Sequence, residues 1–133
     1  MSKKVYRCSR QQNVLWLRAA VAQSIQAPIV VRLLVDTGAS YTVLPTKILE
    51  RIGCNLKQAQ QYKKIVTANG AIDVPIVTIP WFNCLGIKLE NYPVVALDLP
   101  VNSFTDGLLG MDFLTEVGAV IDTAQAQITV KSK

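Results

Sequence analysis

The carboxylate of Asp36 occupies a position in the sequence that indicates a reactive group. Asp36 belongs to residues 35–40, which read Val-Asp-Thr-Gly-Ala-Ser and end an apolar stretch that only Arg32 interrupts. Burying an unpaired charge is costly, so a carboxylate that leaves a buried strand into a Thr-Gly turn indicates chemistry. The alternative is an ordinary turn aspartate between two strands. The pattern occurs once, and Asp36 is the first candidate for a general acid or base.

The other reactive side chains exclude several kinds of site. The chain has three cysteines, Cys8, Cys54 and Cys84, and no histidine. Their odd number and wide spacing argue against a disulfide framework and a zinc site. The absence of histidine also excludes nucleophilic triads that need a histidine base. We therefore expect no metal, no cofactor and three reduced thiols in a cytoplasmic protein.

Length and composition predict one folded domain over residues 1–133. Half of the residues are apolar and 17% are charged, which is typical of a globular chain. An apolar fraction this high in a small domain indicates that some apolar surface is buried against a partner. A second copy of the chain is the simplest such partner.

The charge pattern argues against two other classes of partner. The net charge is +5, but the basic residues are scattered and are not interleaved with aromatic side chains. We therefore expect no nucleic-acid partner. Arg18 and Arg32 interrupt the apolar region 14–35, so no uncharged run is long enough to span a membrane.

Most of the sequence consists of short apolar runs bounded by Gly and Pro, which is typical of β-strands. Two strands are expected at 14–21 and 29–35, joined by a hairpin connection at 23–28, and a hairpin is expected around Asn69-Gly70 as a type I′ turn with both residues at positive φ. Pro45 at the first helical position and Gly53 predict a helix over 46–52, and Gly118 ends a second over 111–117. Further strands are expected at 76–79, 87–89, 92–97, 120–122 and 127–130.

These features together resemble the retropepsin family of retroviral-type aspartic proteases. The resemblance is carried by Asp36-Thr37-Gly38-Ala39, by the hairpin with its tip at Gly70, and by Leu108-Leu109-Gly110 with a helix after it. It covers roughly residues 14 to 130. The family implies a closed, mostly antiparallel β domain with one or two short helices, which forms half of a two-fold symmetric dimer.

The resemblance also implies a mechanism for Asp36. Each protomer would place this residue at the two-fold axis, because a short chain with one motif supplies the second carboxyl group only by self-association. Two carboxyl groups about 3 Å apart cannot both ionise, so the pair holds one proton. One partner would activate a water that attacks the scissile peptide carbonyl, and the other would hydrogen-bond that carbonyl. The expected activity is that of an aspartic endopeptidase.

The family implies supporting roles for further residues. Thr37 would hydrogen-bond across the axis, and Gly38 would donate its N–H to the carboxylate. Residues 62–76 would form the flap that closes over an extended peptide substrate. The residues expected to bind substrate are Leu34, Ala39, Ser40, Val43, Ala68, Asn69, Gly70, Ala71, Ile72 and Leu108. Leu34 and Val43 are equally suited to the core.

The chain departs from the viral pattern at two positions. Where retroviral enzymes carry an acidic residue after Asp-Thr-Gly-Ala and an Arg after the later Gly, this chain has Ser40 and Met111. Both partners of that ion pair are missing together, which leaves no orphan charge. Two other hypotheses stay open: a protease-fold module that binds peptides or dimerises with little or no turnover, and a basic binder of nucleic acid or membrane surfaces.

Overall fold

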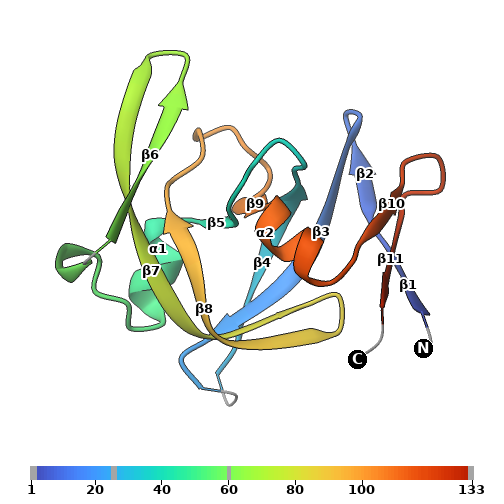
Figure 1. Ribbon diagram of the computed structural model, residues 1–133, viewed down its shortest axis with the longest axis horizontal. Coiled ribbons are helices and arrows are strands. Elements are labelled where there is room, and N and C mark those ends of the chain that lie inside the picture. Colours follow the sequence, from blue (N-terminus) through green and yellow to red (C-terminus); the bar gives the residue numbers. More distant parts are fainter. Residues whose placement is uncertain (1–2, 25–26, 60, 132–133) are drawn as a thin grey trace.

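The chain folds mainly into β-strands, with two short α-helices and one 3-10 helix (Figure 1). The computed structural model describes residues 3–24, 27–59 and 61–131. The strands are β1 (Lys3–Arg7), β2 (Ser9–Gln11), β3 (Val14–Ala22), β4 (Ile29–Val35), β5 (Val43–Leu44), β6 (Gln61–Thr67), β7 (Gly70–Cys84), β8 (Ile87–Ala96), β9 (Gly107–Leu109), β10 (Val120–Asp122) and β11 (Gln127–Lys131). The helices are α1 (Thr46–Arg51), η1 (Leu56–Gln58) and α2 (Met111–Glu116).

The main sheet is closed on itself. Its eight strands follow the order β2-β3-β4-β9-β5-β8-β7-β6, and β3 also pairs with β7. Most pairings are antiparallel, but β9 runs parallel to β4, and β5 parallel to β8. The predicted fold class, a closed and mostly antiparallel β domain with two short helices, is confirmed. A second sheet, in the order β1-β11-β10, brings the two ends of the chain together (Figure 1).

The core follows from the period of two along the strands. In β3 the residues Leu15, Leu17, Ala19 and Val21 are buried, whereas Arg18 on the opposite face is exposed. Helix α2 closes the core from one side. Its Phe113 is fully buried and meets the Phe82 ring edge-on, with the centroids 5.5 Å apart. Phe82 in turn stacks on Tyr92 at 5.0 Å.

The region around Asp36 depends on a close crossing of two chain segments. Strands β4 and β9 lie side by side, with Val35 opposite Leu109. Beyond them, the Met111 N–H donates to the Ala39 carbonyl at 2.8 Å. A Cβ on Gly107 would lie 2.0 Å from the Val43 oxygen, and one on Gly110 would lie 2.5 Å from the Tyr41 oxygen. Glycine is therefore required where the two segments cross.

Strands β7 and β8 are longer than the sequence predicts. Separate short strands were expected at 76–79, 87–89 and 92–97, but β7 continues through Pro75 and Pro80, and β8 is one strand. The pairing register is the same before and after Pro80, with Ile79 opposite Tyr92 and Trp81 opposite Glu90. A proline removes one backbone donor, and the many other hydrogen bonds of these strands hold the register.

The remaining differences lie at the ends of elements. Strands β1 and β2 were not predicted, because their side chains are mostly exposed and polar and β1 is held by its pairing with β11. Pro45 is the N-cap of α1, with an extended ψ of 149°, and not its first helical residue. Strands β3 and β4 pair as predicted, while residues 25 and 26 of the predicted connection lie outside the described residues. Of the helices in the described ranges, none has the length and apolar character needed to cross a membrane.

Gly110→Ala should lower the free energy of unfolding by about 1–3 kcal/mol. The added Cβ would meet backbone atoms of Tyr41, which cannot turn away as a flexible side chain can. Urea unfolding followed by circular dichroism measures the change. Gly38→Ala is the matched control, because its Cβ would meet one side-chain oxygen at 3.2 Å. If Gly110→Ala proved as stable as the wild type, the close crossing would be contradicted.

Candidate active site

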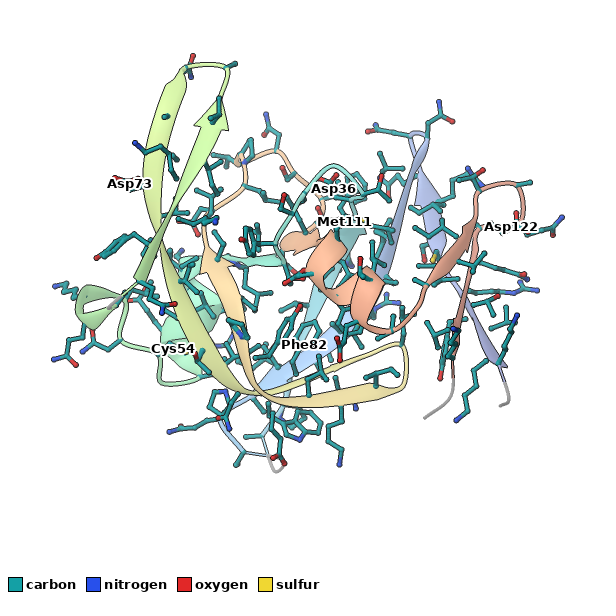
Figure 2. All side chains as sticks on the ribbon, in the orientation of Figure 1. Asp36, Cys54, Asp73, Phe82, Met111 and Asp122 are labelled. Carbon is teal, nitrogen blue, oxygen red and sulfur yellow. The ribbon has the colours of Figure 1, made fainter. Side chains whose placement is uncertain are left out.

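Asp36 sits at the end of β4, in a tight loop that its own backbone organises. Its N–H donates to the Leu109 carbonyl at 3.1 Å, and the Ala39 N–H donates to the Asp36 carbonyl at 3.2 Å. The Gly38 N–H donates to Asp36 Oδ1 at 2.9 Å. A Cβ on Gly38 would lie only 3.2 Å from that oxygen. The loop therefore holds the carboxylate through a backbone donor. Asp36 is labelled in Figure 2.

A buried polar cluster joins this loop to the start of α2. Thr42 is fully buried; its Oγ1 donates to Asp112 Oδ1 at 2.9 Å and accepts from the Gly110 N–H at 3.2 Å. The Tyr92 hydroxyl donates to Asp112 Oδ2 at 2.7 Å. Burial raises the pKa of Tyr92, and the Asp112 carboxylate adds to this while a hydrogen bond with Thr42 opposes it. Every member of the cluster is thus hydrogen-bonded.

Asp112 has a more specific place than the sequence suggests. As expected, it stands at the start of a helix, where it also accepts from the Phe113 N–H at 2.8 Å. Sequence reasoning missed its partners Thr42 and Tyr92, which are far from it in the chain. A threonine within an otherwise apolar stretch after the Asp-Thr-Gly turn was the one signal that pointed to Thr42.

Two cavities lie on either side of the Asp36 loop. One, of about 330 Å³, is lined by Asp36 and Thr37 together with Asn13, Val14, Leu15, Leu34, Val35, Ile121 and Thr123. The other, of about 310 Å³, is mostly apolar and lies between the loop and the β6–β7 hairpin. It is lined by Gly38, Ala39, Ser40, Tyr41, Val43, Lys63, Lys64, Ile65, Val66, Val95, Leu97 and Leu108.

The β6–β7 hairpin projects from the body of the protein (Figure 1). Its strands pair from Gln61 opposite Ile76 to Thr67 opposite Gly70, so Ala68 and Asn69 form the two-residue turn. The predicted type I′ turn over Asn69-Gly70 is wrong. Gly70 has φ of 116°, but Asn69 does not have a positive φ. The hairpin itself is present, and one glycine provides its unusual backbone angle.

The base of this hairpin is anchored to the Asp36 loop. The Lys63 Nζ lies 4.9 Å from the centroid of the Tyr41 ring. A small buried cluster at the same end of the hairpin is formed by Val43, Val74 and Val95. These contacts lie at the base of the hairpin, and Val66 near the tip is 82% exposed. Sequence reasoning missed this anchor because its residues come from four different strands and from the loop that contains Tyr41.

The structure distributes the residues that the sequence assigned to substrate binding over three places. Leu34 lines the cavity that contains Asp36, and Ala39, Ser40, Val43 and Leu108 line the other. The hairpin tip carries Ala68, Asn69, Gly70 and Ala71. Ile72 is 43% exposed and stands opposite Ile65 in the hairpin. It lines neither cavity among the described residues.

The two positions that depart from the viral pattern lie beside each other. The Asp112 N–H donates to the Ser40 carbonyl at 3.2 Å, directly after the contact between Met111 and Ala39. Met111 is 40% exposed. With Thr37, Leu114 and Ile121 it lines a further shallow cavity of about 370 Å³. This surface is apolar where the viral pattern has an ion pair.

Other candidate chemistry finds little support. A larger cavity of about 450 Å³ lies beside η1 and β7, but no carboxylate is among its described lining residues. The cysteines are free, and burial raises the pKa of each thiol, most of all that of Cys84. Over residues 3–24, 27–59 and 61–131, no three His, Cys, Asp or Glu side chains are grouped to hold a metal ion.

Comparison with known proteins agrees with the geometry. Residues 21–113 match a family model described as aspartyl protease, so this chain belongs to the aspartyl protease family. A search of curated proteins finds no match. Among solved structures, a retropepsin-like aspartic protease from Rickettsia conorii is similar, with a TM-score of 0.68 and 21% identity over 97% of this chain and 92% of the other.

A second solved structure supports the same fold. The retroviral protease-like domain of Ddi1 from Leishmania major has a TM-score of 0.56 and 17% identity, covering 90% of each chain. At these identities the likeness concerns the fold. The chain therefore has the retropepsin-like fold that its sequence predicted.

Thr42→Val should lower the free energy of unfolding by about 1–3 kcal/mol, because it leaves the buried Gly110 N–H without an acceptor. Thr42→Ser is the matched control, since it keeps the hydroxyl and loses only a methyl group. Urea unfolding of the two variants gives the comparison. A loss with serine as large as that with valine would assign the effect to packing and not to the hydrogen bonds.

Proposed function

We propose that this protein is an aspartic endopeptidase that works as a homodimer, with residues 1–133 forming one protease domain. The observation that carries the proposal is the Asp36 loop. Its carboxylate receives the Gly38 N–H at 2.9 Å and lines a cavity of about 330 Å³. Membership of the aspartyl protease family supports peptide hydrolysis as the reaction.

The single motif explains the need for a dimer. Hydrolysis of a peptide by carboxyl groups needs both a base and an acid, and this chain carries Asp-Thr-Gly once. Asp36 of one protomer and Asp36 of its partner would meet at the two-fold axis and share one proton. The exposed Thr37 would hydrogen-bond across the axis and hold the two loops in register.

The reaction follows from the two protonation states. The ionised carboxylate takes a proton from a bound water while the protonated one hydrogen-bonds the peptide carbonyl. The water oxygen bonds to the carbonyl carbon and gives a tetrahedral diol. Its collapse breaks the C–N bond as a carboxyl proton passes to the leaving nitrogen. No covalent enzyme intermediate is formed, and a histidine is not needed.

The substrate would lie as an extended peptide between the Asp36 loop and the β6–β7 hairpin. Backbone hydrogen bonds along such a peptide are independent of its sequence, whereas alternate side chains enter pockets. The apolar cavity lined by Val43, Ile65 and Leu108 suits an aliphatic or aromatic side chain next to the scissile bond. The hairpin tip would close over the peptide.

The dimer contact would be apolar. Thr37, Met111, Leu114 and Ile121 share one shallow cavity, and the ion pair of the viral pattern is replaced by Ser40 and Met111. The dimer would then be held by apolar contact, and its population would rise with protein concentration.

Asp36→Asn should abolish peptide cleavage and leave the fold and the dimer intact. An amide can neither take the proton from water nor share one with its partner. Cleavage of a pool of unstructured peptides, read by mass spectrometry with and without a statine inhibitor, measures the activity. Glu50→Gln is the matched control: it makes the same change of carboxylate to amide at an exposed position of α1.

Two outcomes would contradict this assignment. Cleavage that persists in Asp36→Asn would remove Asp36 from the mechanism. A wild-type protein that binds peptides and the statine inhibitor but never cleaves would instead be a peptide-binding module with the protease fold.

The specific activity should rise with protein concentration until the dimer is saturated, because only the dimer holds both carboxyl groups. Sedimentation and cleavage measured at the same protein concentrations test this. A specific activity that stays constant while sedimentation shows a change from dimer to monomer would contradict catalysis by the dimer.

A further inference from the structure

Two arginines face each other on the outer surface of the main sheet. Arg18 of β3 stands directly opposite Arg32 of β4 in the pairing register, and both are exposed. Like charges directly opposite each other destabilise an antiparallel pair. The pair is therefore a local cost to the fold that a bound anion would relieve.

A tryptophan holds both guanidinium groups in place. The Cζ atoms of Arg18 and Arg32 each lie 5.2 Å from the centroid of the Trp16 ring. Trp16 is only 9% exposed, and Phe104 meets its ring edge-on with the centroids 6.5 Å apart. Stacked guanidinium groups have lost much of their freedom already, so less is lost when they donate hydrogen bonds to a ligand.

The described residues give these arginines no carboxylate partner in an ion pair. Asp106 is near, but its Oδ2 accepts from the backbone N–H of Arg32 at 2.7 Å. Within the described part of the chain neither guanidinium group forms an ion pair. The buried Trp16 Nε1 likewise finds no acceptor among these residues. We call the cluster of Trp16, Arg18, Arg32 and Phe104 the exosite.

The exosite continues from the candidate active site. Trp16 stands opposite Leu34, and Leu34 lines the cavity that contains Asp36. Arg32 precedes Asp36 by four residues along an extended strand, which corresponds to about 13 Å. A peptide held at Asp36 would thus bring a residue several positions from its scissile bond over the two arginines.

We propose that Arg18 and Arg32 bind an acidic side chain of the polypeptide substrate, outside the segment that is cleaved. This inference rests on the proposed function. The planar guanidinium fork matches the two oxygens of a carboxylate, and two adjacent forks suit a pair of neighbouring Asp or Glu residues. Nucleic acid fits less well, because the Trp16 ring is covered and offers no open face on which a base could stack.

Binding of a fluorescein-labelled hexaglutamate peptide to the full-length Asp36→Asn protein tests the proposal without turnover. The dissociation constant from fluorescence anisotropy should rise at least about tenfold in a variant that adds Arg18→Gln and Arg32→Gln. The matched control adds Lys47→Gln and Arg51→Gln, which remove the same charge from exposed positions of α1, and should bind like the parent. A hexaglutamine peptide should not bind.

A spectroscopic readout tests whether the peptide reaches the arginines themselves. The chain has two tryptophans, so Trp81→Phe leaves Trp16 as the only one. Hexaglutamate should then change the emission of Trp16, and this change should be absent after Arg18→Gln and Arg32→Gln. Circular dichroism of each variant confirms that the fold is kept.

Three results would overturn the proposal. An equal loss of binding in the α1 control would reduce the effect to net charge. Tighter binding of a dT decamer than of hexaglutamate would assign the exosite to nucleic acid. Failure of hexaglutamate to bind the parent protein would remove the exosite altogether. Because the parent carries Asp36→Asn, none of these results depends on cleavage, so failure of the peptidase activity is detected separately.

Discussion

The crossing of the two segments that follow β4 and β9 is the constraint on which the rest of this protein depends. Backbone hydrogen bonds between Asp36 and Leu109 and between Met111 and Ala39 hold the segments together. Two glycines allow the approach, since any side chain at Gly107 or Gly110 would overlap backbone atoms. The carboxylate of Asp36 therefore has a fixed direction before any substrate or partner arrives, which is the preorganisation that catalysis requires.

The buried cluster around Thr42 provides hydrogen-bond partners for the polar groups that this crossing buries. Unpaired polar groups there would be expensive, but Thr42, Tyr92 and Asp112 satisfy one another and the Gly110 N–H. The same aspartate accepts the Phe113 N–H at the start of α2. One side-chain cluster thus ties the segment after the Asp36 loop, β8 and α2 to each other.

The loop around Asp36 and the neighbouring β6–β7 hairpin differ in how strongly the core holds them. The loop and its cavities are fixed by the core, whereas the β6–β7 hairpin is held at its base by Tyr41, Lys63 and a small apolar cluster. An element with few buried contacts opens at low free energy, as a flap over a substrate must. The residues around Met111 that line a shallow cavity do not include Arg18 or Arg32, so the proposed dimer contact and the proposed outer substrate contact use different residues.

The sequence by itself determined strands β3, β4, β10 and β11, both α-helices, the hairpin, the family and the position of Asp36, because each rests on local periodicity or on a short motif. Strands β1 and β2, the unbroken course of β7 through Pro80, and the turn at Ala68 and Asn69 depend on pairing partners, which local pattern does not specify. The partners of Asp112, the anchor of the hairpin and the stacking of Arg18 and Arg32 on Trp16 were decided only by the tertiary structure. Those contacts join residues distant in the chain, and no local property of a residue shows which distant side chain will meet it.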